Sequence, residues 1–269
     1  MTPNCFMIAS SGSSATKWVS RVLNLHPSIT AWHANEETED KLSLKSEDAL
    51  AASLNEKVKQ SGTFVGTIHI TPWHGVEMQP HIEKLKGRFC GLLRHPVYRI
   101  NSQSESKIKN NAPPNYDRYR GNLNLLINEI PGLFIAFTEK FGTVFSYGQV
   151  EFAVAAYRVF NYEVDLLTLP KRQLFFYESL TKEKSEFSRF VTYLCPGLNV
   201  TESYLHDVFN FGKINSHHAV VPVSVKDIYN TFWDEPRRFI FEYILSYFAD
   251  KYDVINKYQA LDYDLTTFR

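Results

Sequence analysis

The amino-acid sequence has no excess of charge of either sign and no long apolar run. Lys+Arg and Asp+Glu number 29 each in 269 residues, so no global field attracts nucleic acid or an anionic membrane. No stretch of about 18 apolar residues could span a bilayer. The first apolar segment starts almost at Met1, which leaves no room for a signal peptide. We therefore expect a soluble cytoplasmic protein with no nucleic-acid or membrane partner.

Cysteine is scarce, and its three copies are far apart. Cys5, Cys90 and Cys195 lie in or beside apolar runs, which is typical of buried free thiols rather than of a disulfide framework. Their spacing does not suit a metal site either. No usable partner spacing is found for His74, His81, His217 and His218. We therefore expect no metal ion.

Apolar runs alternate with amphipathic segments along the chain. With 44% hydrophobic and 14% aromatic residues, it can bury one large core or at most two small ones. Alternating strands and helices favour an α/β fold, a three-layer sandwich with a mostly parallel central sheet and helices on both faces. We expect one domain over residues 1–269. The expected strands are Cys5–Ala9, Ile29–Trp32, Thr63–Ile70, Phe89–Leu93 and Gln173–Tyr177.

Helices are expected between these strands. The first begins at Thr16 and is stopped by Pro27. Residues 105–150 are expected to include a helical cap region, with Asn110–Tyr119 as a loop, and Val200–Val223 is expected to be irregular. The other expected helices are Ser46–Lys59, Pro80–Lys86, Ser102–Lys109, Val150–Leu167, Lys182–Leu194 and Glu235–Lys251.

Polar or charged residues follow the apolar strands. In parallel sheets, ligands bind beyond the carboxyl ends of the strands. That rule puts Ser10–Lys17, His69, Arg94 and Tyr177 at one edge, because each follows a strand. The first of these segments joins a loop of small residues to a helix N-terminus, whose N–H groups and dipole suit a phosphate or sulfate group. An ordinary strand–turn–helix without a ligand fits this segment alone equally well.

The loop differs from that of the nucleoside triphosphatases. Their G-x4-G-K-[ST] motif has a second Gly before the Lys and a hydroxyl after it. Here Gly12 is followed five residues later by Lys17 and then by Trp18. A metal-dependent kinase would lack its Mg²⁺-binding hydroxyl.

Two further constellations follow later strands. Arg94 at a strand end supplies a charge-assisted fork, Pro96 fixes the turn, and Ser102 supplies a hydroxyl that can converge with Arg94 on one phosphate. The other constellation is Tyr177-Glu178 at the end of the last expected strand. Taken separately, Arg94 fits a surface ion pair and Tyr177 a core aromatic equally well.

Together these stretches resemble the sulfotransferases that use 3′-phosphoadenosine 5′-phosphosulfate (PAPS). The family's 5′-phosphosulfate loop reads about [KR]-S-G-[TS]-[TS]-[WL], and residues 13–18 align with it when counted back from His26-Pro27. Arg94-x-Pro96 with Ser102 is similar to the family's 3′-phosphate motif. Phe176-Tyr177-Glu178-x-Leu180 is similar to its Y-E-[DS]-L strand end.

The resemblance implies a P-loop-like sulfotransferase fold. It also implies transfer of a sulfuryl group from PAPS to a hydroxyl, or in second place an amine, of a small-molecule acceptor. The products would include 3′-phosphoadenosine 5′-phosphate (PAP), and no metal is required. The residues implied to bind PAPS are Ser13, Ser14, Ala15, Thr16, Lys17, Trp18, Arg94, Ser102 and Tyr177. The identity of the acceptor and the oligomeric state, including a homodimer, stay open.

Three loop positions depart from the family pattern. Ser13 stands where a Lys or Arg usually stabilises the bridging oxygen, Ala15 replaces the usual Gly, and Lys17 replaces a Thr or Ser. One interpretation is that Lys17 has taken over the cationic role. The other is that catalysis is impaired and the chain is a PAPS-binding protein. We favour the first, because three phosphate-reading elements survive.

Two residues are candidates for the base that accepts the acceptor's proton. His69, in Thr-Ile-His-Ile-Thr-Pro, is similar to the His in the Lys-Thr-His-Leu-Pro context of the cytosolic enzymes. Glu37, in Glu-Glu-Thr, resembles the Glu of the tyrosylprotein type, although it is displaced by three residues. A His accepts a proton near pH 7 with little perturbation, whereas a Glu needs its pKa raised by burial. The acidic run around Glu37 is also typical of a solvated loop.

Overall fold

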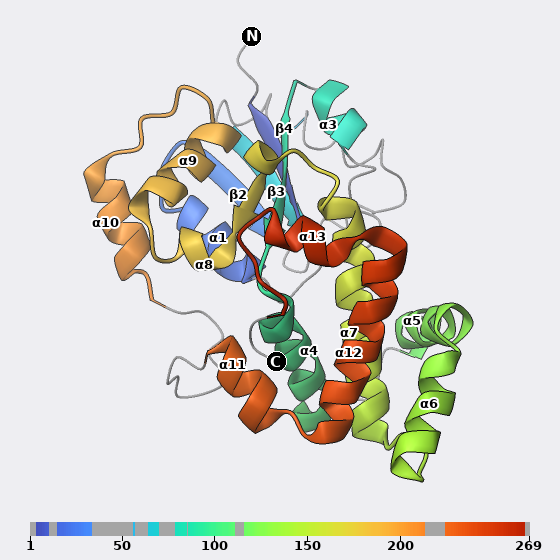
Figure 1. Cartoon of the computed structure of the whole chain (residues 1–269). Coiled ribbons are helices and arrows are strands. Elements are labelled where there is room, and N and C mark those ends of the chain that lie inside the picture. The colour runs from blue at the N-terminus through green and yellow to red at the C-terminus, as the bar shows by residue number, and fades with distance from the viewer. Residues whose placement is uncertain are drawn as a thin grey trace. The chain divides into compact units, whose positions relative to one another are not determined.

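The computed structural model describes residues 4–10, 15–33, 56, 64–69, 79–84, 86–110, 116–212 and 224–266 (Figure 1). The chain forms two compact units, and the single domain expected over residues 1–269 stays an expectation. The first comprises Met1–Arg94 and Thr168–Ala219, and the second comprises His95–Leu167 and Val220–Arg269. In the ranges that the structure describes, no helix has both the length and the apolar composition needed to cross a bilayer.

Five strands in the described part of the first unit form one sheet in the order β2-β3-β1-β4-β5, and every pairing is parallel. Helices flank the sheet, so the expectation of an α/β fold with a parallel central sheet is confirmed. The strands are β1 (Cys5–Ala9), β2 (Ile29–His33), β3 (Phe64–His69), β4 (Arg88–Leu93) and β5 (Leu174–Phe176). Each end lies within one residue of the expected position.

The central strand β1 is buried along its whole length. Its Phe6 lies opposite Gly66 of β3, and a Cβ atom at Gly66 would overlap the Phe6 ring. The glycine thus leaves the space that Phe6 fills. β1 and β3 stay in register up to the pairing of Ala9 with His69, so these two strands end level with one another.

Four helices in the described part of the first unit share an apolar core with the sheet. They are α1 (Thr16–Leu23), α8 (Tyr177–Leu180), α9 (Lys184–Leu194) and α10 (Glu202–Asn210). The core includes Phe6, Ile8, Val19, Val22, Cys90, Phe175, Phe187, Phe190 and Leu205. The other helical segments in the described part of this unit are α3 (Gln79–Lys84) and η3 (Lys171–Gln173), and Glu56 is helical as well.

All three cysteines are buried, as expected. Burial raises the pKa of the Cys5 thiol to about 11 and that of Cys195 to about 12, and it raises the pKa of Cys90 as well. Because the thiolate is the reactive form, these side chains are inert at neutral pH and serve as small apolar groups.

The carboxyl end of α1 is fixed to its neighbours by hydrogen bonds. The side-chain amide of Asn24 donates to the Ala31 carbonyl, and the Ala31 N–H donates back to Asn24 Oδ1, both at 2.8 Å. The hydroxyl of Tyr204 in α10 donates to the Val22 carbonyl at 3.1 Å. The helix is therefore tied to both β2 and α10.

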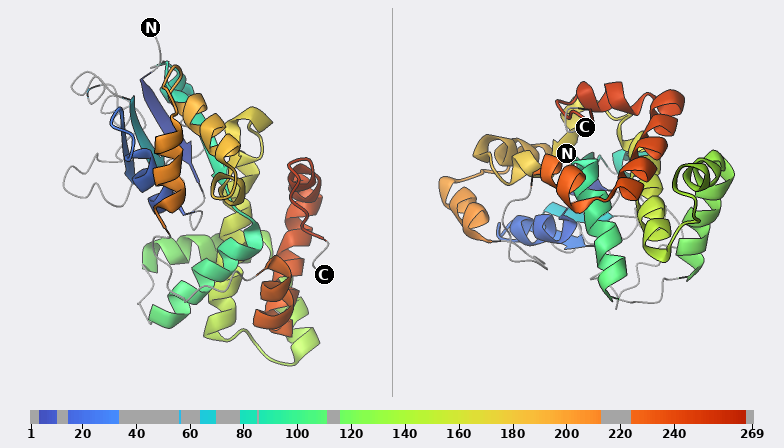
Figure 2. Two further views of the ribbon diagram at one scale, coloured as in Figure 1. Left: turned by 90° about the vertical axis from the view of Figure 1, so that its left-hand side faces the viewer. Right: turned by 60° about the horizontal axis from the view of Figure 1, so that its bottom comes forward.

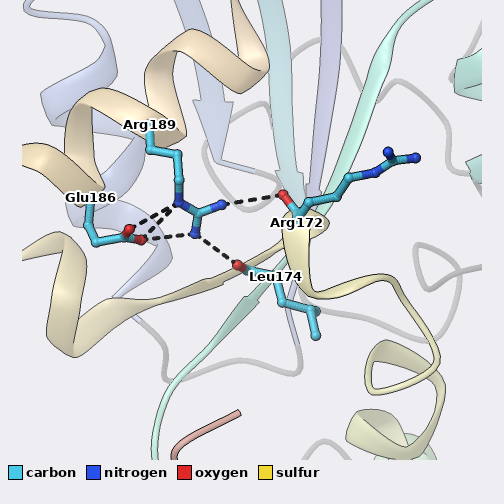
Figure 3. A network of polar contacts seen from close by, with 4 residues as sticks. All are labelled: Arg172, Leu174, Glu186 and Arg189. Carbon is cyan, nitrogen blue, oxygen red and sulfur yellow. Dashed lines mark hydrogen bonds and ion pairs between the residues drawn. The ribbon is translucent and has the colours of Figure 1, made fainter. Parts of the chain in front are cut away.

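A guanidinium covers part of the last strand, β5. Arg189 of α9 donates to the backbone oxygen of Leu174 at 3.3 Å and to that of Arg172 at 3.4 Å (Figure 3). It also donates to the Glu186 carboxylate, with a shortest distance of 2.9 Å, and its guanidinium carbon lies 4.2 Å from the centroid of the Phe175 ring. These contacts hold α9 to the edge of the sheet.

The described part of the second unit is helical. Both α4 (Pro96–Asn110) and α12 (Glu235–Tyr252) pack against α7 (Tyr147–Leu166) (Figure 2). Between α4 and α7 lies a buried ion pair of Arg99 and Glu163, in which each charge compensates the burial of the other. The remaining helical segments are α5 (Tyr116–Glu129), α6 (Gly132–Phe141), α11 (Val225–Asp227), η4 (Ile228–Phe232) and α13 (Val254–Gln259).

Two segments that were expected to lack regular structure are in part helical. The loop expected over Asn110–Tyr119 is wrong at both ends, since α4 includes Asn110 and α5 begins at Tyr116. The irregular segment expected over Val200–Val223 contains α10, whose N-cap Thr201 accepts a hydrogen bond from the Tyr204 N–H. Apart from the helical Glu56, the expected helix over 46–59 lies outside the described residues.

Candidate anion-binding site

The parallel strands bring polar residues to one edge of the sheet. In sheet order, the strands end at His33, at His69, at Ala9 before Ser10, at Leu93 before Arg94, and at Phe176 before Tyr177. Ala9 pairs with His69, and Leu93 pairs with Phe176, so Arg94 and Tyr177 leave their strands at the same level. These residues share one edge, as the rule for parallel strands predicts.

The sheet changes its winding direction between β1 and β4. The chain leaves β1 through α1 and returns in β2 on one side, whereas the chain that leaves β4 returns in β5 on the other side. In open α/β sheets, ligands bind at the carboxyl ends of the strands where the connections diverge in this way. Ser10 follows β1 and Arg94 follows β4, the two strands that flank this point.

The first turn of α1 follows a residue with unusual backbone geometry. Ala15 has φ 55° and ψ 33°, in the left-handed region that favours glycine, and its carbonyl accepts the first helical hydrogen bond from Val19. The N–H groups of such a first turn have no partner within the helix and can bind an anion. Lys17 lies in this turn and is half-buried.

A buried polar contact joins the start of α1 to the end of β2. Oγ1 of Thr16 lies 2.8 Å from Nε2 of His33. Both side chains are buried. No sequence pattern singles out His33, because the expected strand ends one residue earlier, at Trp32.

A cation and two aromatic rings form a row across the same edge. The guanidinium carbon of Arg94 lies 5.2 Å from the centroid of the Tyr177 ring. That ring meets Trp18 of α1 edge-on, with centroids 6.1 Å apart. Burial raises the pKa of the Tyr177 phenol, and the charge of Arg94 lowers it in part. The sequence placed Tyr177 at the end of a strand, but it is the first residue of α8.

Of the other residues implied to be functional, His69 is the one in the described ranges that ends a strand of the sheet, as the last residue of β3. Ser102 is exposed on α4 of the second unit. Ser13, Ser14 and Glu37 lie outside the described residues.

No family model, curated protein or solved structure matches the chain. The assignment of the site therefore depends on its own residues. Within the described ranges, no group of three or more His, Cys, Asp or Glu side chains could hold a metal ion. What the edge does offer is a helix N-terminus, the cations Lys17 and Arg94, and aromatic rings. Such groups can bind an anion that is attached to a planar ring.

The geometry of Ala15 predicts a gain in stability. Ala15→Gly should raise the free energy of unfolding by about 0.5–1 kcal/mol, because a left-handed L-residue costs roughly 1–2 kcal/mol and the greater freedom of glycine in the unfolded chain offsets only part of that. Urea denaturation measures the change. Ala9→Gly, within the buried strand β1, is the matched control and should lower stability. A loss of stability in Ala15→Gly similar to that of the control would contradict the assignment of backbone strain to residue 15.

Proposed function

We propose that the chain is a PAPS-dependent sulfotransferase that acts on a hydroxyl, or in second place an amine, of a small-molecule acceptor. The observation that carries the proposal is the row of Arg94, Tyr177 and Trp18 beside the N-terminus of α1. It combines a cation and aromatic rings with an anion-binding helix end, which are the groups that an adenine nucleotide with separate phosphates needs. The switch point between β1 and β4 supports the same class of ligand.

Each part of the donor has a partner in this proposal. The 5′-phosphosulfate binds the first-turn N–H groups of α1, together with the preceding loop. Arg94 binds the 3′-phosphate, and the ring of Tyr177 packs beside the adenine. Ser102 is assigned to the 3′-phosphate on the basis of its sequence motif alone.

The transfer breaks the bond between sulfur and the bridging oxygen and forms a bond from sulfur to the acceptor oxygen. By analogy with phosphoryl transfer, the two oxygens lie in line with the sulfur and the transition state is loose. Negative charge builds on the bridging oxygen of PAP, where Lys17 stabilises it. His69 or Glu37 takes the proton of the acceptor hydroxyl.

Two measurements separate this proposal from its rivals. Calorimetric titration with PAP tests the binding site, and turnover of PAPS over a panel of phenols, alcohols and amines without Mg²⁺ tests the reaction. A PAPS-binding protein with impaired catalysis would bind PAP and turn nothing over. A nucleotide kinase would turn over a nucleoside triphosphate and would need Mg²⁺. The transferase assignment would be rejected by this result, and equally by PAP binding without any turnover.

The role of Arg94 predicts a preference between nucleotides. The protein should bind PAP more tightly than adenosine 5′-phosphate, and Arg94→Ala should weaken PAP binding about 10–100-fold through loss of a charge-assisted contact worth roughly 1.5–3 kcal/mol. Calorimetry with both nucleotides measures this. Arg88→Ala, which changes an exposed Arg at the other end of β4, should leave both affinities unchanged. If the wild type bound the two nucleotides equally well, the assignment of Arg94 to the 3′-phosphate would be wrong.

The base can be identified by two substitutions. His69→Ala should lower turnover about 10²–10⁴-fold while PAP still binds, since general-base catalysis contributes about that much. His206→Ala, an exposed His on α10, is the control and should retain full turnover. If His69→Ala stays active and Glu37→Gln is inactive, Glu37 is the base. Full activity of both variants would show that neither His69 nor Glu37 is the base.

Lys17 should act in the transition state rather than in ground-state binding. Lys17→Met should lower kcat at saturating PAPS more than it weakens binding of PAP, because charge on the bridging oxygen develops only as the bond breaks. Steady-state kinetics and calorimetry together measure the difference. Arg21→Met, at an exposed position in the last turn of α1, is the matched control. An unchanged kcat in Lys17→Met would show that Lys17 is an ordinary surface residue of the helix with no role in the transition state.

A further inference from the structure

His33 and Thr16 form a buried polar contact at the edge that carries the candidate site. Nε2 of His33 lies 2.8 Å from Oγ1 of Thr16, and the two side chains are only 2% and 5% exposed. The histidine is the last residue of β2, and the threonine is the first residue of α1. The imidazole therefore touches the helix end at which the phosphosulfate is proposed to bind.

Other contacts already hold α1 in place. The two hydrogen bonds between Asn24 and Ala31 fix its far end to β2, and Val19 and Val22 are fully buried in the core. An apolar pair in place of His33 and Thr16 would pack between these elements without the cost of burying polar groups. The polar pair therefore points to a chemical use of the hydroxyl.

The hydroxyl of Thr16 has a single hydrogen, and the contact with His33 decides where it is directed. If Nε2 accepts, that hydrogen is committed to the imidazole and the hydroxyl cannot donate to an anion. If Nε2 carries a hydrogen, it donates to Oγ1, and the hydroxyl hydrogen is left for a second acceptor. An anion at the start of α1 is bound by donors, so its binding selects the second arrangement.

We propose that His33 is a positioning residue: its Nε2–H donates to Thr16 and directs the Thr16 hydroxyl hydrogen toward the bound phosphosulfate. His33 acts through Thr16 and does not itself contact the ligand. The inference rests on the proposed function, because it places an anion at the start of α1. It adds a residue that the loop motif does not contain, from a strand outside the motif.

The hydrogen on Nε2 can be observed directly. In the full chain labelled with ¹⁵N-histidine, the ring signals of His33 are assigned by their absence from His33→Gln. At saturation with inorganic sulfate, and separately with PAP, Nε2 should carry a hydrogen. A bare Nε2 in the anion-loaded protein overturns the proposal. If sulfate binds with Nε2 protonated and PAP does not bind, the proposed function fails while the assignment of His33 stands. If neither anion binds, both fail.

Matched variants test whether the two side chains act as one unit. Thr16→Val keeps the shape and removes the hydroxyl, and it should weaken PAP binding about 10-fold. His33→Leu should weaken binding to a similar extent, and the double variant should bind no more weakly than Thr16→Val alone. His33→Gln retains an amide donor and should stay within about 3-fold of the wild type. Thr16→Ser, which keeps the hydroxyl, is the control for side-chain volume.

A purely structural role for His33 gives a different pattern. The His33→Leu variant would then bind PAP as tightly as the wild type does. Alternatively, the substitution His33→Leu would weaken PAP binding by the same factor in the wild type and in Thr16→Val. His33→Gln would also fail to restore the affinity. Each of these results overturns the proposal.

Discussion

The packing of Phe6 over Gly66 is the contact on which the candidate site depends. It lets β1 and β3 lie side by side in register, while β4 pairs with the other side of β1. Because the strands are parallel, their polar continuations emerge together without long connections. A larger side chain at residue 66 would separate β3 from β1, and with it His69 from the loop after Ala9.

The aromatic row adds rigidity to this edge. Trp18 contacts both Tyr177 and Phe187, so α1, α8 and α9 meet around one side chain. A surface that is ordered before the ligand arrives loses less conformational entropy on binding than one assembled around it. The phenol of Tyr177 is neutral at physiological pH, as tyrosine ordinarily is, and burial raises its pKa further, so the hydroxyl has a hydrogen to donate.

Much of this arrangement could be predicted from the sequence, because each strand is a short apolar run with a polar residue after it. His33 could not, since only the pairing of His33 with Ile68 shows that β2 extends past Trp32, and its contact with Thr16 joins residues 17 positions apart. Tyr177 begins a helix because β5 ends where its pairing with β4 ends, at Phe176, and the apolar run does not reveal that length. The cap of α10 was open to prediction, because Thr201 followed by an acidic first turn is a common helix start.

The contacts of Arg189 have a consequence for the chain in concentrated solution. Exposed strand edges recruit strands from other molecules, and natural proteins cover them with charged side chains. In β5, the guanidinium occupies the Leu174 carbonyl, to which an incoming strand would bond. Replacing Arg189 would therefore turn the sheet edge into a template for aggregation. The loss would be one of solubility during folding, and the molecules that folded would keep the candidate anion-binding site.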